Sequence, residues 1–191
     1  MSQAANHAPG RIVVISGPAG VGKGTVCKRL QQRWPELALS VSATTRPARP
    51  GEREGREYFF VSDEQFDELI ATGGLLEWAE VHGSARYGTP RAAVNELVAQ
   101  GRTVILEIEP QGARQVRAAL PDPITIFLAP PSWEELVNRL AGRGTETTAQ
   151  QQRRLETARV ELAAVQEFDH IVENRTVDQA ADDIAALLGL A

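Results

Sequence analysis

A glycine-rich segment near the start of the chain limits most strongly what the chain can fold into. Residues 17–25 read Gly-Pro-Ala-Gly-Val-Gly-Lys-Gly-Thr, directly after an apolar run at 12–15 and directly before a helical pattern. In a strand–loop–helix arrangement, such a segment surrounds a phosphate with backbone N–H groups, a helix N-terminus and a lysine. We therefore expect a phosphate-binding loop with Lys23 as its point charge. Gly24 departs from the pattern, because a Ser or Thr at this position normally offers magnesium a hydroxyl.

The bulk properties exclude several classes of protein. The 191 residues suit one buried core with a small inserted lobe, and 42% hydrophobic with 24% charged residues is ordinary for a globular protein. No apolar run reaches the roughly 18 residues of a membrane helix, and residues 1–10 lack the features of a signal peptide. We therefore expect a flexible tail at 1–10, a cytoplasmic location and no membrane contact. A net charge of −5 argues against nucleic acid as the main partner.

Helical and strand patterns alternate along most of the chain, which predicts an α/β fold with a mostly parallel sheet between helices. Strands are expected at 11–16, 37–42, 103–108, 123–128 and 170–172, and helices at 22–34, 91–100, 111–120, 132–140, 150–168 and 177–188. The rhythm breaks over 43–88, where a Pro- and Gly-containing stretch precedes a strand at 57–61, a helix at 62–71, a strand at 75–81 and a turn at 83–88. We interpret 43–88 as an inserted lobe and the polar segment 141–149 as a flexible loop.

Arginines gather in two places where they could neutralise phosphate. Arg46 and Arg49 lie on a proline-stiffened stretch, so their guanidinium groups would lose little freedom on binding a phosphate. Arg139 and Arg154 flank the polar segment and Arg143 lies in it, where a mobile lid could bring them onto a transferring phosphoryl group.

Two acids end a buried strand. Glu107 and Glu109 follow the apolar residues 104–106 and point to the same face by the two-residue period of a strand. Ligands bind at the carboxyl edge of such sheets, so we expect these acids to serve magnesium or a ligand.

These segments together resemble the guanylate kinase family from about residue 11 to residue 188. The resemblance is carried by the order of short motifs: residues 14–18, 40–46, Gly51-Glu52 with Tyr58, 76–80, 87–89, Gln111-Gly112, 129–132 and 142–146. It implies a P-loop NTPase-type three-layer sandwich with an inserted mixed-sheet lobe for GMP and a helical lid. It also implies transfer of the γ-phosphate of ATP to GMP, and more weakly to dGMP, with magnesium.

The resemblance implies roles for matching residues. The catalytic set would be Lys23, Arg46, Arg139, Arg143 and Arg154. ATP would be bound by Gly17, Pro18, Ala19, Gly20, Val21, Gly22, Lys23, Gly24, Thr25 and, beside the adenine, Asn174. The GMP phosphate would be held by Arg46, Arg49, Tyr58 and Tyr87, and the guanine by Ser42, Glu77, Thr89 and Glu109. Guanine N1 and N2 donate to carboxylates, whereas adenine lacks these donors and would leave a buried Glu unpaired.

The resemblance implies a core of 11–42 and 89–191, a GMP-binding lobe of 43–88 and a lid at about 139–156. The protein would be a monomer or a homodimer. Magnesium would be held by the ATP phosphates, by water, and by Thr25 or Glu107.

Several residues depart from the family pattern. Ala19 and Gly24 stand where Ser is usual, Glu107 and Glu109 where Asp is common, and the turn at 83–88 is one residue longer, with Arg86 in the place of a Tyr.

Three other interpretations compete with this one. Adenylate kinases share Gly-Lys-Gly-Thr, but their Asp-Gly-Phe-Pro-Arg string is absent here. A ribose-bisphosphate phosphokinase is similar at the first loop and is disfavoured by the context of Glu77 and Tyr58. Non-catalytic scaffold modules resemble the lobe but have degraded loops and lids, whereas Lys23, Arg143 and Arg154 are present here.

Overall fold

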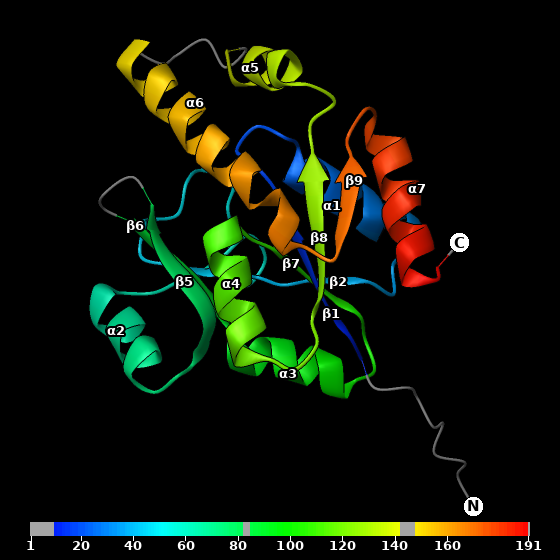
Figure 1. The fold of residues 1–191 in the computed structure, drawn as a ribbon. Coiled ribbons are helices and arrows are strands. Elements are labelled where there is room, and N and C mark those ends of the chain that lie inside the picture. The colour runs from blue at the N-terminus through cyan, green and yellow to red at the C-terminus, as the bar shows by residue number, and fades with distance from the viewer. Residues whose placement is uncertain (1–9, 82–84, 142–147, 191) are drawn as a thin grey trace, which may run out of the picture.

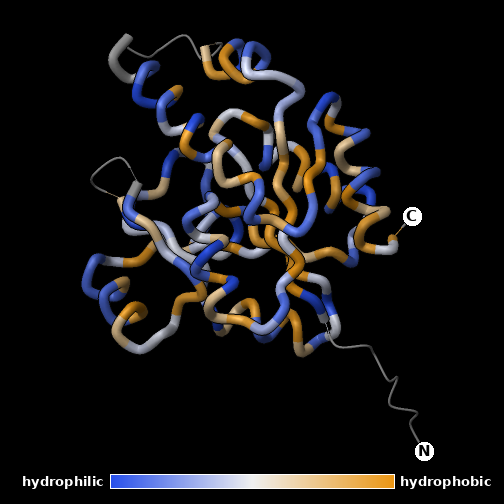
Figure 2. The backbone as a smooth tube through the Cα atoms, viewed as in Figure 1, coloured by the Kyte–Doolittle hydropathy of each residue, from blue (hydrophilic) through white to orange (hydrophobic). Residues whose placement is uncertain are grey.

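The core of the molecule is a five-stranded sheet in which every neighbouring pair of strands runs parallel. The computed structural model describes residues 10–81, 85–141 and 148–190. The strand order is β2-β7-β1-β8-β9 (Figure 1). The strands are β1 (Ile12–Ser16), β2 (Ala38–Leu39), β7 (Val104–Glu107), β8 (Ile124–Ala129) and β9 (His170–Glu173). Runs of Val, Ile and Leu suit this sheet because both of its faces are covered, as the hydrophobic colouring of the central strands in Figure 2 illustrates.

Helices cover the two faces of this sheet. Val13 and Ile15 point into one apolar cluster, which α1 (Lys23–Arg33) and α7 (Val177–Leu188) close. Val14, on the opposite face, joins a second cluster with α3 (Arg91–Ala99) and α4 (Pro110–Ala119). Alternation along one strand thus supplies both cores. The remaining helices are α5 (Trp133–Ala141) and α6 (Thr148–Ala163), with a 3-10 turn, η1 (Ala164–Glu167), after α6. No helix within the described ranges is long and apolar enough to cross a membrane.

A second, smaller sheet lies beside the core (Figure 1). Its order is β4-β3-β6-β5, formed by β3 (Ala43–Thr44), β4 (Phe59–Phe60), β5 (Leu75–Val81) and β6 (Ala85–Pro90). It is mixed, because β3 and β4 are parallel while β6 is antiparallel to both β3 and β5. The helix α2 (Asp63–Ala71) packs on it through the fully buried Phe66.

Several sequence-based predictions differ from the structure. Of the strand expected at 37–42, only Ala38–Leu39 is a strand, β2, because the chain then leaves the core sheet and enters the second sheet at Ala43, where β3 begins. The turn expected at 83–88 is wrong for 85–88, because these residues pair with β5 and β3 and begin β6. The loop expected at 141–149 is wrong at both ends, since α5 ends at Ala141 and α6 begins at Thr148. The expected α/β fold with a parallel core sheet and a mixed second sheet is confirmed.

Candidate active site

The loop between β1 and α1 has the shape needed to surround an anion. Gly17 has a φ of 147°, and a Cβ there would lie 2.3 Å from the carbonyl oxygen of Leu128, so only glycine fits. Gly22 is the N-cap of α1 in the left-handed conformation, and no side chain caps this helix end. The first N–H groups of α1 therefore remain available to a bound anion.

Lys23 lies across this loop. Its side chain is nearly buried, with 8% of the residue exposed. The ammonium donates to the carbonyl oxygen of Gly17 at 2.7 Å and to Oε2 of Glu109 at 3.1 Å. The positive charge is thus held at the loop by both a backbone acceptor and a carboxylate from the N-cap residue of α4, just after β7.

A cavity of about 980 Å³ opens over the loop. Most of the residues expected to bind ATP line it, together with both expected acids. The lining residues are Pro18, Ala19, Gly20, Gly22, Lys23, Gly24, Thr25, Lys28, Arg29, Gln32, Glu107, Glu109, Arg139 and Val177. Sequence reasoning missed Lys28, Arg29 and Gln32, although their spacing after Thr25 places them on the same face of α1. They would add two positive charges to an anion site.

The loop is supported from behind by α5 and by the end of β9. Asn174 is buried, and its Nδ2 donates to the carbonyl oxygen of Val21 at 2.8 Å. Arg139 donates to the same carbonyl at 3.3 Å and to the carbonyl oxygen of Asn174 at 3.1 Å. Asn174, expected beside the ATP adenine, is not among the residues that line the cavity, and its amide supports the loop instead.

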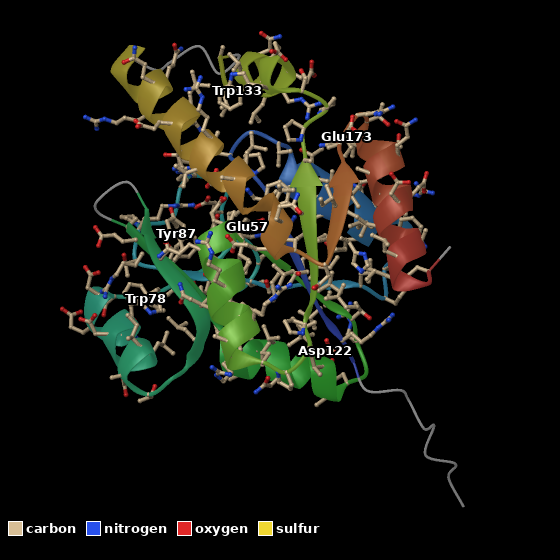
Figure 3. All side chains as sticks on the ribbon, in the orientation of Figure 1. Glu57, Trp78, Tyr87, Asp122, Trp133 and Glu173 are labelled. Atoms are coloured by element: carbon tan, nitrogen blue, oxygen red, sulfur yellow. The ribbon has the colours of Figure 1, made fainter. Side chains whose placement is uncertain are left out.

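Of the two other expected lid arginines, one lies apart from this cavity and the other lies outside the described residues. Arg154 on α6 lines a separate cavity of about 80 Å³ between α5 and α6, with Val137, Leu140 and Leu155. Arg143 lies outside the described residues. Trp133 of α5, labelled in Figure 3, packs against the guanidinium of Arg159 from α6 at 4.9 Å, which joins the two helices.

Glu107 fills the space left by the missing side chain at position 24. A Cβ built on Gly24 would lie 3.2 Å from Oε1 of Glu107. Desolvation raises the pKa of Glu107, while the charge of Lys23 opposes this rise. Thr25, exposed in the first turn of α1, lines the same cavity as Glu107. A carboxylate and a hydroxyl are ligands that suit Mg²⁺, so this corner of the cavity fits the cation.

A second cluster, on the small sheet, combines an arginine with two tyrosines. Arg46 donates to the hydroxyl of Tyr87 at 3.1 Å and stacks 4.9 Å from the ring centre of Tyr58. Its guanidinium also donates to both carboxylate oxygens of Glu52 at 2.7 Å, which lowers the pKa of Glu52 to about 2. Tyr87 is labelled on the small sheet in Figure 3. Arg49, by contrast, is exposed, and its backbone N–H donates to Glu52. The sequence predicts no role for Glu52, although Gly51-Glu52 is one of the motifs that carry the family resemblance.

A buried carboxylate lies on the same sheet. Glu77 is 7% exposed, and its Oε1 accepts a hydrogen bond of 2.6 Å from the hydroxyl of Thr89. Burial raises the pKa of Glu77, and the negative charge of Glu109 adds to the rise. Ser42 is half-buried, and its carbonyl accepts the N–H of Phe59. The expected base-reading residues are therefore divided: Glu77 and Thr89 bond to each other, whereas Glu109 pairs with Lys23.

Comparisons with known proteins identify similar sequences and structures. The family model described as guanylate kinase matches residues 9–190. A guanylate kinase of Thermobifida fusca is 58% identical over 187 residues, which cover 98% of this chain and 95% of the relative. A guanylate kinase of Cutibacterium acnes is 59% identical over 182 residues, covering 95% of this chain and 92% of the relative. The crystal structure of guanylate kinase from Anaplasma phagocytophilum superposes with a TM-score of 0.76 at 34% identity, covering 95% of this chain and 86% of the other.

Proposed function

The chain belongs to the guanylate kinase family, and on that premise we propose which of its residues perform the reaction. The chain is an enzyme that transfers a phosphoryl group from ATP to GMP, giving ADP and GDP. The assignments below concern the sites, the metal and the finer choice of substrate.

We assign the cavity over the phosphate loop to ATP. The uncapped N-terminus of α1, the ammonium of Lys23 and the glycine-only backbone at Gly17 support this assignment. The loop residues 17–25 would surround the phosphates, with Lys28 and Arg29 adding positive charge. Asn174 would act from behind, by holding the carbonyl of Val21 and so the shape of the loop. Arg139 donates to the same carbonyl from the wall of the cavity.

We assign the small sheet to GMP. One cluster on this sheet, made of Arg46, Tyr58 and Tyr87, suits a phosphate. In this structure the guanidinium of Arg46 donates to both carboxylate oxygens of Glu52 instead. The phosphate of GMP would share or replace that carboxylate, with the exposed Arg49 joining it. Glu77 would accept from N1 and N2 of guanine, while Ser42, Thr89 and Glu109 complete the base site. The same site would take dGMP more weakly.

Transfer would then be direct and in line between the two bound nucleotides. Lys23 and Arg46 would hold the donor and acceptor phosphates and neutralise the charge that moves between them. Arg139, Arg143 and Arg154, on or next to the lid, would add positive charge when the lid closes and excludes water. The lobe of 43–88 and the lid at about 139–156 are proposed to close over the pair.

Magnesium, when bound, would neutralise phosphate charge and orient the oxygens of ATP. Glu107 and Thr25 would hold it, directly or through water. The carboxylate of Glu107 stands where a hydroxyl at position 24 would otherwise reach, and this is the observation behind the assignment.

The magnesium assignment can be tested by nucleotide binding without turnover. Calorimetry would compare the affinity for a non-hydrolysable ATP analogue with and without magnesium in the wild type, Glu107→Gln, Thr25→Val and the double variant. We expect Glu107→Gln to lose about tenfold or more of the affinity gained with magnesium, because carboxylates contribute this much to metal binding. A magnesium effect that is unchanged in all three variants would contradict the assignment.

The single observation that carries the ATP assignment is Lys23 lying across the loop at the wall of the cavity. Lys23→Met should reduce turnover by about 100-fold or more, because it removes the charge aimed at the phosphates. Circular dichroism and thermal melting should show an intact fold. Turnover within a factor of two of the wild type would remove the loop from the mechanism.

The proposal also covers the setting of the enzyme. Its substrates are small nucleotides, and we propose a cytoplasmic enzyme, monomeric or homodimeric, that acts without nucleic acid or membrane partners. Light scattering during gel filtration would decide between the two oligomeric states.

A further inference from the structure

Glu161, which sequence reasoning did not single out, joins α6 directly to the phosphate loop. The backbone N–H of Ala19 donates to Oε2 of Glu161 at 2.9 Å, across 142 positions in the sequence. Ala19 lines the large cavity, so the carboxyl group of Glu161 meets the loop at the cavity wall. The second half of α6, beyond the proposed lid, therefore has a defined contact with the proposed ATP site.

The same carboxyl group lies in a partly buried and acidic setting. Burial first, and then the negative charge of Glu109, raise the pKa of Glu161 to about 7, while the N–H of Ala19 opposes the rise. The carboxyl group can accept the N–H of Ala19 whether or not it carries a proton.

Two side chains hold the start of the loop. Lys23 donates to the carbonyl of Gly17, two residues before Ala19, and to the carboxylate of Glu109. Glu161 accepts the N–H of Ala19 from α6. A partly buried acid in this position costs desolvation free energy, which is typical of a functional site.

We propose that Glu161 is a positioning residue that fixes the N–H of Ala19 and, with it, the start of the phosphate loop. This rests on the proposed function, which assigns the loop to ATP. Glu161 then supports the ATP site from α6 without touching the nucleotide. Its loss should weaken the binding of ATP, because the loop N–H would lose a restraint.

The test compares three variants. Glu161→Gln keeps an acceptor for Ala19, whereas Glu161→Met keeps the length but not the hydrogen bond. Val160→Met is the control, at an exposed position on the same helix beyond the proposed lid. We expect Glu161→Gln and the control to stay within about threefold of the wild type in KM for ATP and GMP. Glu161→Met should raise the KM for ATP by about tenfold. A merely structural role would instead lower the active fraction, and so kcat, while leaving KM unchanged.

Two further measurements keep the outcomes distinct. Hydrogen exchange at the amide of Ala19 should be slow in the wild type and in Glu161→Gln, and fast in Glu161→Met; fast exchange in the wild type would overturn the proposal even if Glu161→Met fails to fold. Equal impairment of Glu161→Gln and Glu161→Met, or unchanged KM values in Glu161→Met, would also overturn it. If the wild type did not phosphorylate GMP, the proposed function would fail, while ADP affinity measured by calorimetry across the same variants would still decide the role of Glu161.

Discussion

Glu77 and Gly112 illustrate how two single residues could set the choice of base. The carboxylate of Glu77 is buried and bonded on one side by Thr89, which leaves its other oxygen against α4. A Cβ built on Gly112 would lie 2.6 Å from that oxygen. The absence of a side chain at 112 therefore makes room for the acid that we propose reads guanine.

Gly112→Ala should displace the carboxylate of Glu77 and raise the KM for GMP by about tenfold, with a smaller effect on the KM for ATP. The reason is that a methyl group closer than 3 Å forces one of the two partners to move. Steady-state kinetics with each nucleotide varied in turn would measure the two values. An unchanged KM for GMP would mean that Glu77 does not have to hold this position.

For single residues, the sequence predicts a role well where a local motif fixes that role. The phosphate loop and Lys23 were found because a strand, glycines and a helix follow one another within a short segment. Glu52 and Glu161 were missed because their partners are set by tertiary contacts: Glu52 bonds Arg46 after a loop turns back, and Glu161 reaches Ala19 from the far end of the chain.

Among the elements, α2 shows most clearly how a short helix is fixed on the small sheet. Ser62 and Gln65 form a capping box in which each side chain bonds the backbone N–H of the other. Arg86 on β6 then bonds Asp63 at 2.7 Å and stacks on Phe66 at 4.8 Å. Arg86, which stands in the place of a Tyr in the family pattern, therefore anchors the helix in this structure.

Ser62→Ala should lower the free energy of unfolding by about 1 kcal/mol, because the first turn of α2 loses its cap. Ser62→Asp keeps an acceptor at the cap and should stay close to the wild type. Urea denaturation of the three proteins would measure the difference. A stability of Ser62→Ala equal to that of the wild type would show that Arg86 and Phe66 fix the helix without the cap.

Element prediction failed where pairing across distant segments decides the structure. The capping box at 62–65 and the helix at 177–188 depend on local pattern and were predicted closely. The strand expected at 37–42 is only Ala38–Leu39 in the structure, because the chain then crosses to the other sheet, which it joins at Ala43. Residues 85–88 contain glycine and read as a turn, but pairing with β5 and β3 makes them a strand.

Over the whole molecule, the two proposed nucleotide sites lie on two different sheets. The parallel core carries the phosphate loop at the end of β1, and the mixed sheet carries Arg46 and Glu77. Glu109 connects the two sites, because it accepts a hydrogen bond from Lys23 and its negative charge contributes to the raised pKa of Glu77. The core sheet was predictable from alternating patterns and buried strands, whereas the strand pairing in the small sheet was not, because two-residue strands carry almost no periodic signal.

The central claim is that the proposed GMP site on the small sheet recognises guanine through the carboxylate of Glu77. The most direct measurement is ADP release by the wild-type protein with ATP, magnesium and one of GMP, AMP, UMP or CMP as acceptor. Our account predicts a kcat/KM for GMP at least about 100-fold above that for AMP, because AMP leaves a buried carboxylate without donors. A kcat/KM for AMP equal to or above that for GMP would contradict it.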